Sequence, residues 1–263
     1  MTRCIRLSAA LVTATLLSLS AACSGSAKSA QSTAAASSSL TPTAVTSSPA
    51  PNPSATAAAW VAVLRTVGLQ PAEMPPGWTS KDYQPNPDEV ALQAALVRCV
   101  GGRDTTADRI AEVHSPDYSQ GEGATVFSTA SSYKSPDDVA ANVEILANPK
   151  ISSCYQTLVQ TQLAKTLAAG TTINRVTFNV TLGPSGGPPN LAATGRGDVN
   201  LTANGQTADL FLKVAFITGG SLQAQVTCEN IGAPVPAGLC DAVIAKVASR
   251  AAAAHLPPNG ATG

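Results

Sequence analysis

The chain has 263 residues, with 16 Lys and Arg against 16 Asp and Glu and only two histidines. Because it carries no excess of positive charge, it lacks the basic surface that attracts nucleic acid, and we expect no nucleic-acid partner. The scarcity of histidine leaves little material for a metal site, and the sequence predicts neither a metal nor another cofactor.

The first 22 residues have the layout of a bacterial export signal. A basic head, Arg3 and Arg6, precedes an uncharged apolar run that is too short to span a membrane. The residues before Cys23, Leu-Ser-Ala-Ala, resemble a lipobox, in which a small residue precedes the cysteine that becomes acylated. We expect residues 1–22 to be removed and Cys23 to carry fatty acid such as palmitate. Ser20 departs from the lipobox pattern, so cleavage by a conventional signal peptidase nearby is the alternative.

Residues 23–57 are predicted to form a disordered tether. The segment is mainly Ser, Ala, Thr and Pro, with Lys28 as its one charge, and has almost no large apolar side chain to offset the entropy of ordering. As a flexible coil of about 35 residues it spans on the order of 30 Å. It is a bare spacer or, alternatively, carries O-glycans. We expect a single folded domain at 58–256 and a disordered tail at 257–263.

Four cysteines remain once the signal peptide is removed and Cys23 is acylated. The compartment outside the membrane is oxidising, so an even number of cysteines predicts disulfides. Three connectivities are possible, and the patterns below favour sequential pairing, Cys99 with Cys154 and Cys228 with Cys240. Zinc is the competing interpretation, but the chain has no Cys-x-x-Cys pair.

Turn and capping residues divide the first half of the domain. A first helical piece is predicted at 58–67, followed by an extended, proline-rich lead-in that contains Trp78. Asn86-Pro87 indicates the start of a helix over 88–100, whose buried stripe contains Leu92, Leu96 and Cys99.

Two strands and two helices follow in the sequence. The strands are predicted at 110–114 and 124–133, joined by a polar loop. Ser135 opens the next helix, whose buried stripe is Val139, Val143 and Leu146. The serine pair at 152–153 caps a further helix, which carries Cys154 in its first turn.

The second half of the domain changes to the alternating period of β-strands. One strand, with a dry and a wet face, is predicted to bury Val176, Phe178, Val180 and Leu182. A two-residue turn at Asn204-Gly205 predicts a hairpin in which Val199 faces Leu210 and Leu201 faces Ala208.

The next turn decides which face of the last strand meets the core, because a one-residue slip exchanges the two faces. A two-residue loop at Gly219-Gly220 would set glutamines opposite buried apolar residues. We therefore predict a three-residue loop, which sets Phe216 opposite Ala224. Cys228 then faces the core together with a final helix, predicted over 237–254, whose stripe contains Cys240, Val243, Ile244 and Val247.

These elements predict an α+β fold with two disulfides. We expect an antiparallel sheet of about five or six strands with helices packed on one face, in the order α, β, β, α, α, β, β, β, β, α after the first helical piece. The lipobox-like end, the tether, the alanine-rich helices and the paired cysteines resemble secreted lipoproteins of mycobacteria and related actinobacteria. More loosely, they resemble disulfide-stapled extracytoplasmic sensor domains of those bacteria. The resemblance implies an envelope location and a ligand cleft, and the lipobox-like end at Cys23 predicts a lipid anchor on the extracytoplasmic face of the cell membrane.

His114 is the one candidate catalytic imidazole, because His255 lies in the tail before two prolines. A serine hydrolase acting on envelope esters or peptides would need a hydroxyl beside this base, and Ser131 and Ser115 are the candidates. The Ser-x-x-Lys spacing of Ser131 and Lys134 is typical of penicillin-recognising enzymes, but on a strand residues three apart point to opposite faces.

Trp78 and Tyr83 are the aromatic residues that could line a binding cleft, and core filling is the alternative. Our first hypothesis is a non-enzymatic envelope lipoprotein whose domain binds a small apolar or glycan-like ligand, or another envelope protein. The second is the serine hydrolase, and a purely structural role as a spacer or coat protein is the third.

Overall fold

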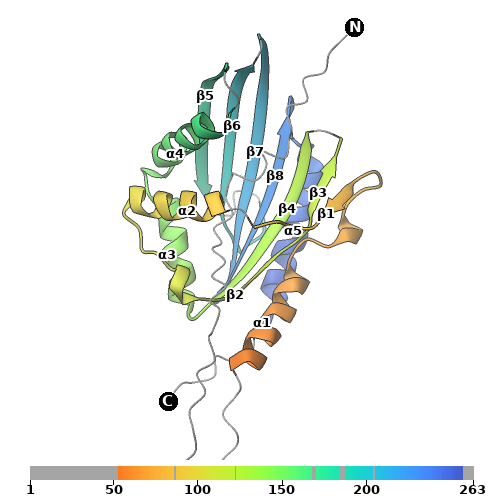
Figure 1. The fold of residues 1–263 in the computed structure, drawn as a ribbon. Helices are drawn as coiled ribbons and strands as arrows, with labels where there is room; N and C mark the ends of the chain where they lie inside the picture. Colours follow the sequence, from red (N-terminus) through yellow and green to blue (C-terminus); the bar gives the residue numbers. More distant parts are fainter. Residues whose placement is uncertain are drawn as a thin grey trace, which may run out of the picture.

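The computed structural model describes residues 53–256 except 86, 122, 168–169, 184–186 and 204. The signal peptide, Cys23, most of the tether and the predicted tail therefore lie outside the described residues. Within them, the chain forms five α-helices and an eight-stranded antiparallel sheet (Figure 1). The predicted α+β class is confirmed, with more strands than expected.

The helices begin and end close to the predicted residues, with two exceptions. α1 begins at Pro53, inside the last residues assigned to the tether. α4 begins before the serine pair, because the turn after Asn148 is already helical and Ser153 donates to Lys150 O instead of capping. The helices are α1 Pro53–Val67, α2 Pro87–Val100, α3 Pro136–Ala147, α4 Ile151–Thr166 and α5 Ala237–Ala253, with short 3-10 helices at Pro71–Glu73 and Thr106–Asp108.

The sheet has the strand order β1-β3-β4-β8-β7-β6-β5, and β2 pairs with β4 beside β3. The extra strands, β1 and β3, lie in segments predicted to be an extended lead-in and a loop. Both are short and are defined by their pairing, not by a local hydrophobic pattern: β1 lies at the edge against β3, and β3 lies between β1 and β4. The bounds are β1 Thr79–Lys81, β2 Arg109–His114, β3 Asp117–Gln120, β4 Ala124–Tyr133, β5 Thr171–Leu182, β6 Leu191–Ala203, β7 Gln206–Gly219 and β8 Leu222–Ile231.

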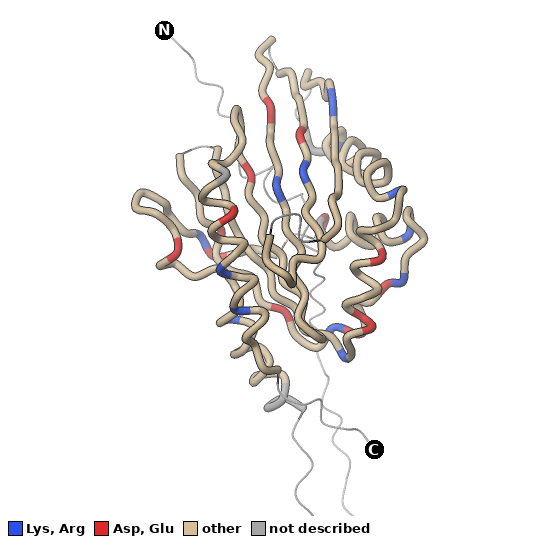
Figure 2. Tube along the Cα trace, turned by 180° about the vertical axis from the view of Figure 1, so that it is seen from behind, with Lys and Arg blue, Asp and Glu red and all other residues tan. Residues whose placement is uncertain are grey.

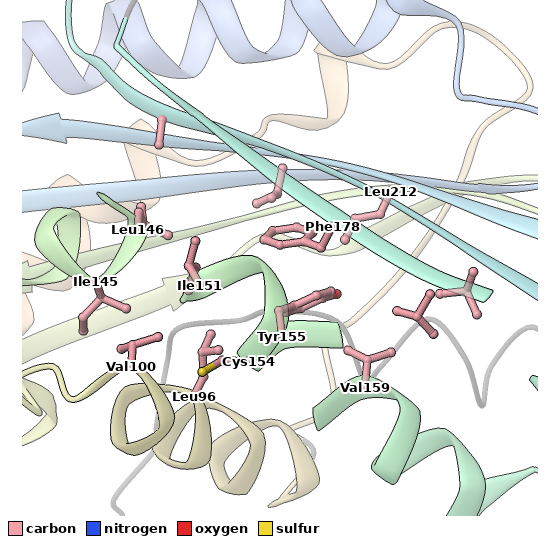
Figure 3. Packing of buried hydrophobic residues seen from close by; sticks show 14 of the residues in the cluster. Leu96, Val100, Ile145, Leu146, Ile151, Cys154, Tyr155, Val159, Phe178 and Leu212 are labelled. Atoms are coloured by element: carbon pink, nitrogen blue, oxygen red, sulfur yellow. The ribbon is translucent and has the colours of Figure 1, made fainter. Parts of the chain in front are cut away.

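Helices cover both faces of the sheet, so the expectation of helices on one face is wrong. On one side, the α2–α4 face, the helices pack against Val176, Phe178, Leu212 and Phe216 of β5 and β7. On the other, the α1/α5 face, α1 and α5 pack against apolar residues of β4, β7 and β8. Figure 3 shows the strands between α5 and the helices that carry Leu96 and Tyr155. Strand β7 contributes to both clusters.

The first hairpin has the predicted register, with Val199 opposite Leu210 and Leu201 opposite Ala208. The second does not. Gly219 pairs with Leu222, so the turn consists of Gly220 and Ser221, and Gly220 has the left-handed φ of 61° that suits glycine. Phe216 consequently faces Gln225 instead of Ala224. The slip turns the glutamines of β8 toward the α2–α4 face, where they are buried.

Both predicted disulfides form, one on each side of the sheet. The Cys99–Cys154 bridge joins α2 to α4, and the Cys228–Cys240 bridge joins β8 to α5. Cys228 and Cys240 lie in the cluster of the α1/α5 face, as predicted for their shared core. Leu212, Val214 and Phe216 point to the opposite side of the sheet.

Arg250 ties the end of α1 to α5. Its guanidinium pairs with the Glu73 carboxylate and donates to Val67 O at 3.1 Å and Gly68 O at 2.8 Å. The next residue, Leu69, donates its N–H to Ser128 Oγ at 2.7 Å, which attaches the end of the helix to β4. These bonds satisfy carbonyls that a helix C-terminus leaves open.

We expect the two disulfides to contribute unequally to stability. They close segments with sequence separations of 55 and 12 residues, and the longer loop restricts the unfolded chain more. Removing Cys99 and Cys154 together as alanines should cost about 4 kcal/mol, and removing Cys228 and Cys240 about 3 kcal/mol, measured by urea unfolding. Equal, small losses in both variants would contradict this account.

Arg250→Met is expected to destabilise the protein by about 2 kcal/mol, because it leaves a largely buried carboxylate without its charged partner. Burial alone would raise the pKa of Glu73, but the hydrogen bonds from Arg250 and the Gln70 backbone outweigh it and lower the pKa.

The same pair predicts a pH dependence. A carboxyl whose pKa is lower in the folded than in the unfolded state stabilises the fold above the unfolded pKa, and this contribution is lost as the pH falls through the folded pKa. Unfolding measured from roughly pH 6 to pH 3 should therefore show a shallower acid dependence for Arg250→Met than for the parent protein. Parallel curves would show that Glu73 is not responsible.

Candidate functional site

Strands β4 and β8 bury polar side chains on the α2–α4 face, and we call this group the polar row. No member is more than 8 % exposed, and the strands place them opposite one another in pairs such as Thr129 with Gln225 and Ser131 with Gln223. The polar row consists of Thr125, Thr129 and Ser131 on β4 and Gln223, Gln225, Thr227 and Glu229 on β8.

The rest of the sheet shows that this burial is unusual. Polar residues of β5 and β6 on the α1/α5 face are half-buried or exposed, and Arg175 there pairs with Asp198 at 2.7 Å. Figure 2 views the molecule from behind and shows acidic and basic residues mixed along the strands. Solvated polar groups cost little, whereas burying an amide or hydroxyl costs free energy unless it finds hydrogen bonds. Burying the polar row therefore costs folding free energy wherever its groups lack hydrogen-bond partners.

Helix α3 supplies hydrogen bonds to one end of the polar row. Asn142 donates to Gln223 Oε1 at 2.9 Å and accepts from Thr105 Oγ1 at 2.7 Å. The Tyr133 hydroxyl, buried on the same face, hydrogen-bonds to Asn142 and Ser131, and burial raises its pKa. Asn142 occupies an inward position beside the predicted stripe of this helix, and half-buried Val143 lies next to it.

The start of α3, which the sequence predicts at Ser135, is held by a capping box. Ser135 Oγ accepts from Asp138 N, and Asp138 Oδ2 accepts from Ser135 N at 2.9 Å. Arg103 also pairs with Asp138. Burial alone would raise the pKa of Asp138, but the bonds from Ser135 and Arg103 outweigh it and lower the pKa. The cap fixes the position of Asn142, one turn further along.

A charged cluster lies beside the polar row, on strand β2. Glu112 Oε1 bonds to His114 Nε2 at 3.0 Å, and Glu112 Oε2 accepts from Arg109 at 2.6 Å and from Ser131 Oγ at 2.9 Å. His114 Nδ1 lies 3.1 Å from Thr129 Oγ1. The histidine therefore connects the carboxylate of β2 with a hydroxyl of the polar row.

Tyr83 covers the imidazole of His114. The two rings stack in parallel, with centroids 3.8 Å apart and an angle of 2° between their planes. Asp117, at the start of β3, is close enough for His114 and Lys81 to lower its pKa, but burial outweighs both and raises it. With 14 % of the His114 side chain and 10 % of the Glu112 side chain exposed, this is where the buried polar groups approach solvent.

The candidate serines are not arranged for nucleophilic catalysis. In a catalytic triad the histidine contacts the nucleophile and the carboxylate orients the histidine. Here the carboxylate of Glu112 lies between Ser131 and His114 and bonds to both. Ser115 Oγ donates to Pro116 O and accepts from Ser128 N, both at 2.9 Å. Within the part of the chain that the structure describes, His114 bonds to Glu112 and Thr129 and to neither serine.

The two aromatic candidates lie in different surroundings. Tyr83 stacks on His114, beside the polar row, whereas Trp78 is half-buried against the cluster of the α1/α5 face. Sequence reasoning named His114, Ser131 and Tyr83 but missed Glu112, Thr129, Asn142 and the polar residues of β8.

One sequence signal could have revealed the β8 residues. The segment Leu222–Glu229 alternates apolar side chains with Gln, Gln, Thr and Glu, and helices both precede and follow the sheet. When helices cover both faces of a sheet, a central strand buries all its side chains, including the alternate positions that are polar.

Among the described residues, no group of three or more His, Cys, Asp or Glu side chains could hold a metal ion. None of the helices in residues 53–256 is long and apolar enough to cross a membrane.

No protein-family model matches the chain, and no curated protein matches it. Among solved structures, the chain is similar to the extracellular domain of PknH from Mycobacterium tuberculosis. The match has a TM-score of 0.39 and 11 % sequence identity, and it covers 73 % of this chain and 95 % of that one. A TM-score this low indicates only a distant likeness, so we argue function from the residues of this chain alone.

The bond between Asn142 and Gln223 predicts coupled effects on stability. Asn142→Leu should cost about 2 kcal/mol, because it leaves buried partners on Gln223 and Thr105 unsatisfied. Adding Gln223→Leu removes one of those partners. The loss of unfolding free energy in the double variant should therefore be smaller than the sum of the two single losses by about 1 kcal/mol. Urea unfolding of the four proteins tests this, and strictly additive losses would refute it.

Proposed function

We propose that this chain is a cell-envelope lipoprotein whose extracytoplasmic domain binds a small, hydroxyl-rich ligand such as a glycan fragment, which reaches the polar row from the end where His114 approaches solvent beside Tyr83. The observation that carries the proposal is the burial of seven polar side chains on two central strands, each no more than 8 % exposed. An apolar core at the same place would serve the fold at least as well, since replacing both buried polar partners by apolar groups is often neutral or favourable. A binding role accounts for keeping them.

The chemistry of the polar row supports a glycan-like ligand over an apolar one. Hydroxyls of threonine and serine both donate and accept, glutamine amides do the same through separate atoms, and the Glu229 carboxylate accepts. Sugar hydroxyls need this mixture of donors and acceptors. Tyr83 and His114 add a stacked aromatic pair at the exposed end of the row. Phe127, buried on the same face of β4, supplies one apolar surface.

The location outside the cytoplasm is supported by the two disulfides, because such bonds persist in oxidising compartments. The lipid on Cys23 is part of the proposal and follows from the sequence before it. In this view the tether holds the domain within reach of the membrane surface and of the polymers of the envelope.

The binding role is tested with the chain from residue 24 onward, which retains every described residue. The oxidised protein is mixed with polar oligosaccharide fragments and, separately, with the lipid fraction of an envelope extract. We expect a polar fragment to be retained in native mass spectrometry and to raise the melting temperature. Retention of lipid alone, or of neither fraction, would contradict the proposal.

A variant within the polar row links binding to the site. Gln225→Leu should weaken the affinity for the retained fragment about tenfold, the equivalent of one hydrogen bond lost to the ligand. The matched control is Gln206→Leu, the same change at an exposed position of β7. Equal affinities of both variants and the parent protein would place the ligand elsewhere.

A further inference from the structure

Both ring nitrogens of His114 have hydrogen-bond partners, and those partners define its neutral tautomer. Nε2 lies 3.0 Å from a Glu112 carboxylate oxygen, which can only accept when ionised, so Nε2 carries the hydrogen. Nδ1 is then the bare nitrogen, 3.1 Å from Thr129 Oγ1. Thr129 must therefore donate its hydroxyl hydrogen to the neutral imidazole.

Protonation of His114 reverses the bond to Thr129. The added proton occupies Nδ1, which becomes a donor, and the hydroxyl oxygen of Thr129 becomes its acceptor. The bond to Glu112 is unchanged, because Nε2 donates in both states. The hydroxyl hydrogen of Thr129 must then turn away from the ring and find another acceptor.

The hydroxyl hydrogen of Thr129 that turns away from the imidazole lies within the polar row. Thr129 is directly opposite Gln225 in the register of β4 and β8, on the same face of the sheet. Gln225 Nε2 in turn donates to Thr227 Oγ1 at 3.2 Å. The amide oxygen of Gln225 has two lone pairs and can accept on that face in addition to a present partner, and a ligand seated on the row can accept as well. Binding of one proton by His114 therefore changes the hydrogen bonding of side chains that we propose to contact the ligand.

The groups around His114 both favour and oppose its charged form. Glu112 on its own strand, Asp117 on β3 and the π-face of Tyr83 favour a cation. Arg109, which pairs with Glu112, and Lys81 on β1, which acts on Asp117, oppose it. Thr129 on β4 carries no charge.

We propose that His114 is a proton-binding site whose occupancy sets the direction of hydrogen bonding along the polar row. When the proton is bound, the Thr129 hydroxyl donates toward β8 and the ligand instead of toward the imidazole. Resting on the proposed function, this makes binding of an acceptor-rich ligand tighter as the pH falls through the titration of His114. By linkage, bound ligand favours the protonated histidine to the same extent.

The test is a pH titration of the ligand-free protein, from residue 24 onward, by nitrogen-15 NMR. The chain has two histidines, and His114→Gln assigns their signals. We expect neutral His114 to show its hydrogen on Nε2. The side-chain amide of Gln225 should shift along the same titration curve as His114. A neutral form with hydrogen on Nδ1, or a Gln225 amide that stays constant while His114 titrates, would overturn the proposal.

Two threonine variants test whether the Thr129 hydroxyl couples His114 to the Gln225 amide. Thr129→Val keeps the shape of the side chain but removes the hydroxyl, and the Gln225 amide should no longer follow His114. Thr125→Val makes the same change at another buried position of the row on β4, away from His114, and should leave the coupling intact. Coupling that survives in Thr129→Val would also refute the proposal. Because no ligand is present, a chain that binds no glycan fragment but shows this coupling refutes the proposed function alone.

Discussion

The register of β8 against β7 is the constraint on which the rest of the structure depends. The two-residue turn at Gly220-Ser221 directs Leu222, Ala224, Val226 and Cys228 to one face and the glutamines, Thr227 and Glu229 to the other. Because a central strand between helix layers is buried on both faces, neither series can be left to solvent. A slip of one residue would exchange the two series, and with them the disulfide to α5.

The two apolar clusters are offset across the sheet as a result. On the α2–α4 face the strand residues of the buried apolar cluster belong to β5, β6 and β7, and on the α1/α5 face they belong mainly to β4, β7 and β8. Strand β7 is the overlap, with Val214 and Phe216 on one side and Ala215 and Ile217 on the other. The polar residues of β5 and β6 on the α1/α5 face are half-buried or exposed, whereas the polar residues of β4 and β8 on the α2–α4 face are buried. This asymmetry is why we place the binding site on β4 and β8.

The sequence predicts the elements whose signals are local. Ser135 with Asp138 three residues later marks a helix start, and the strand at 124–133 and the Asn204-Gly205 hairpin have the predicted bounds or register. Sequential disulfide pairing follows from helix stripes and strand faces. Apart from the disulfides, whose partners are 55 and 12 residues apart, these inferences succeed because each depends on residues within one or two turns of chain.

The remaining features depend on contacts between distant segments. β3 pairs with β4 and β1 pairs with β3, and no periodicity in the sequence predicts either strand. The sequence predicts a three-residue loop because burying glutamines is costly, yet Asn142, 81 residues from Gln223, supplies the partner that lowers this cost. Polar groups that we propose to bind ligand are where a rule derived from hydrophobic burial is expected to fail.

The account is tested most directly by measuring the register of β7 and β8 in solution. Cross-strand proton contacts in NMR report which backbones lie opposite one another in an antiparallel pair. We predict contacts of Phe216 with Gln225 and of Val214 with Thr227, as the structure shows. Contacts of Phe216 with Ala224 and of Val214 with Val226 would contradict the account, because the glutamines would then point away from α3 and the polar row would not form.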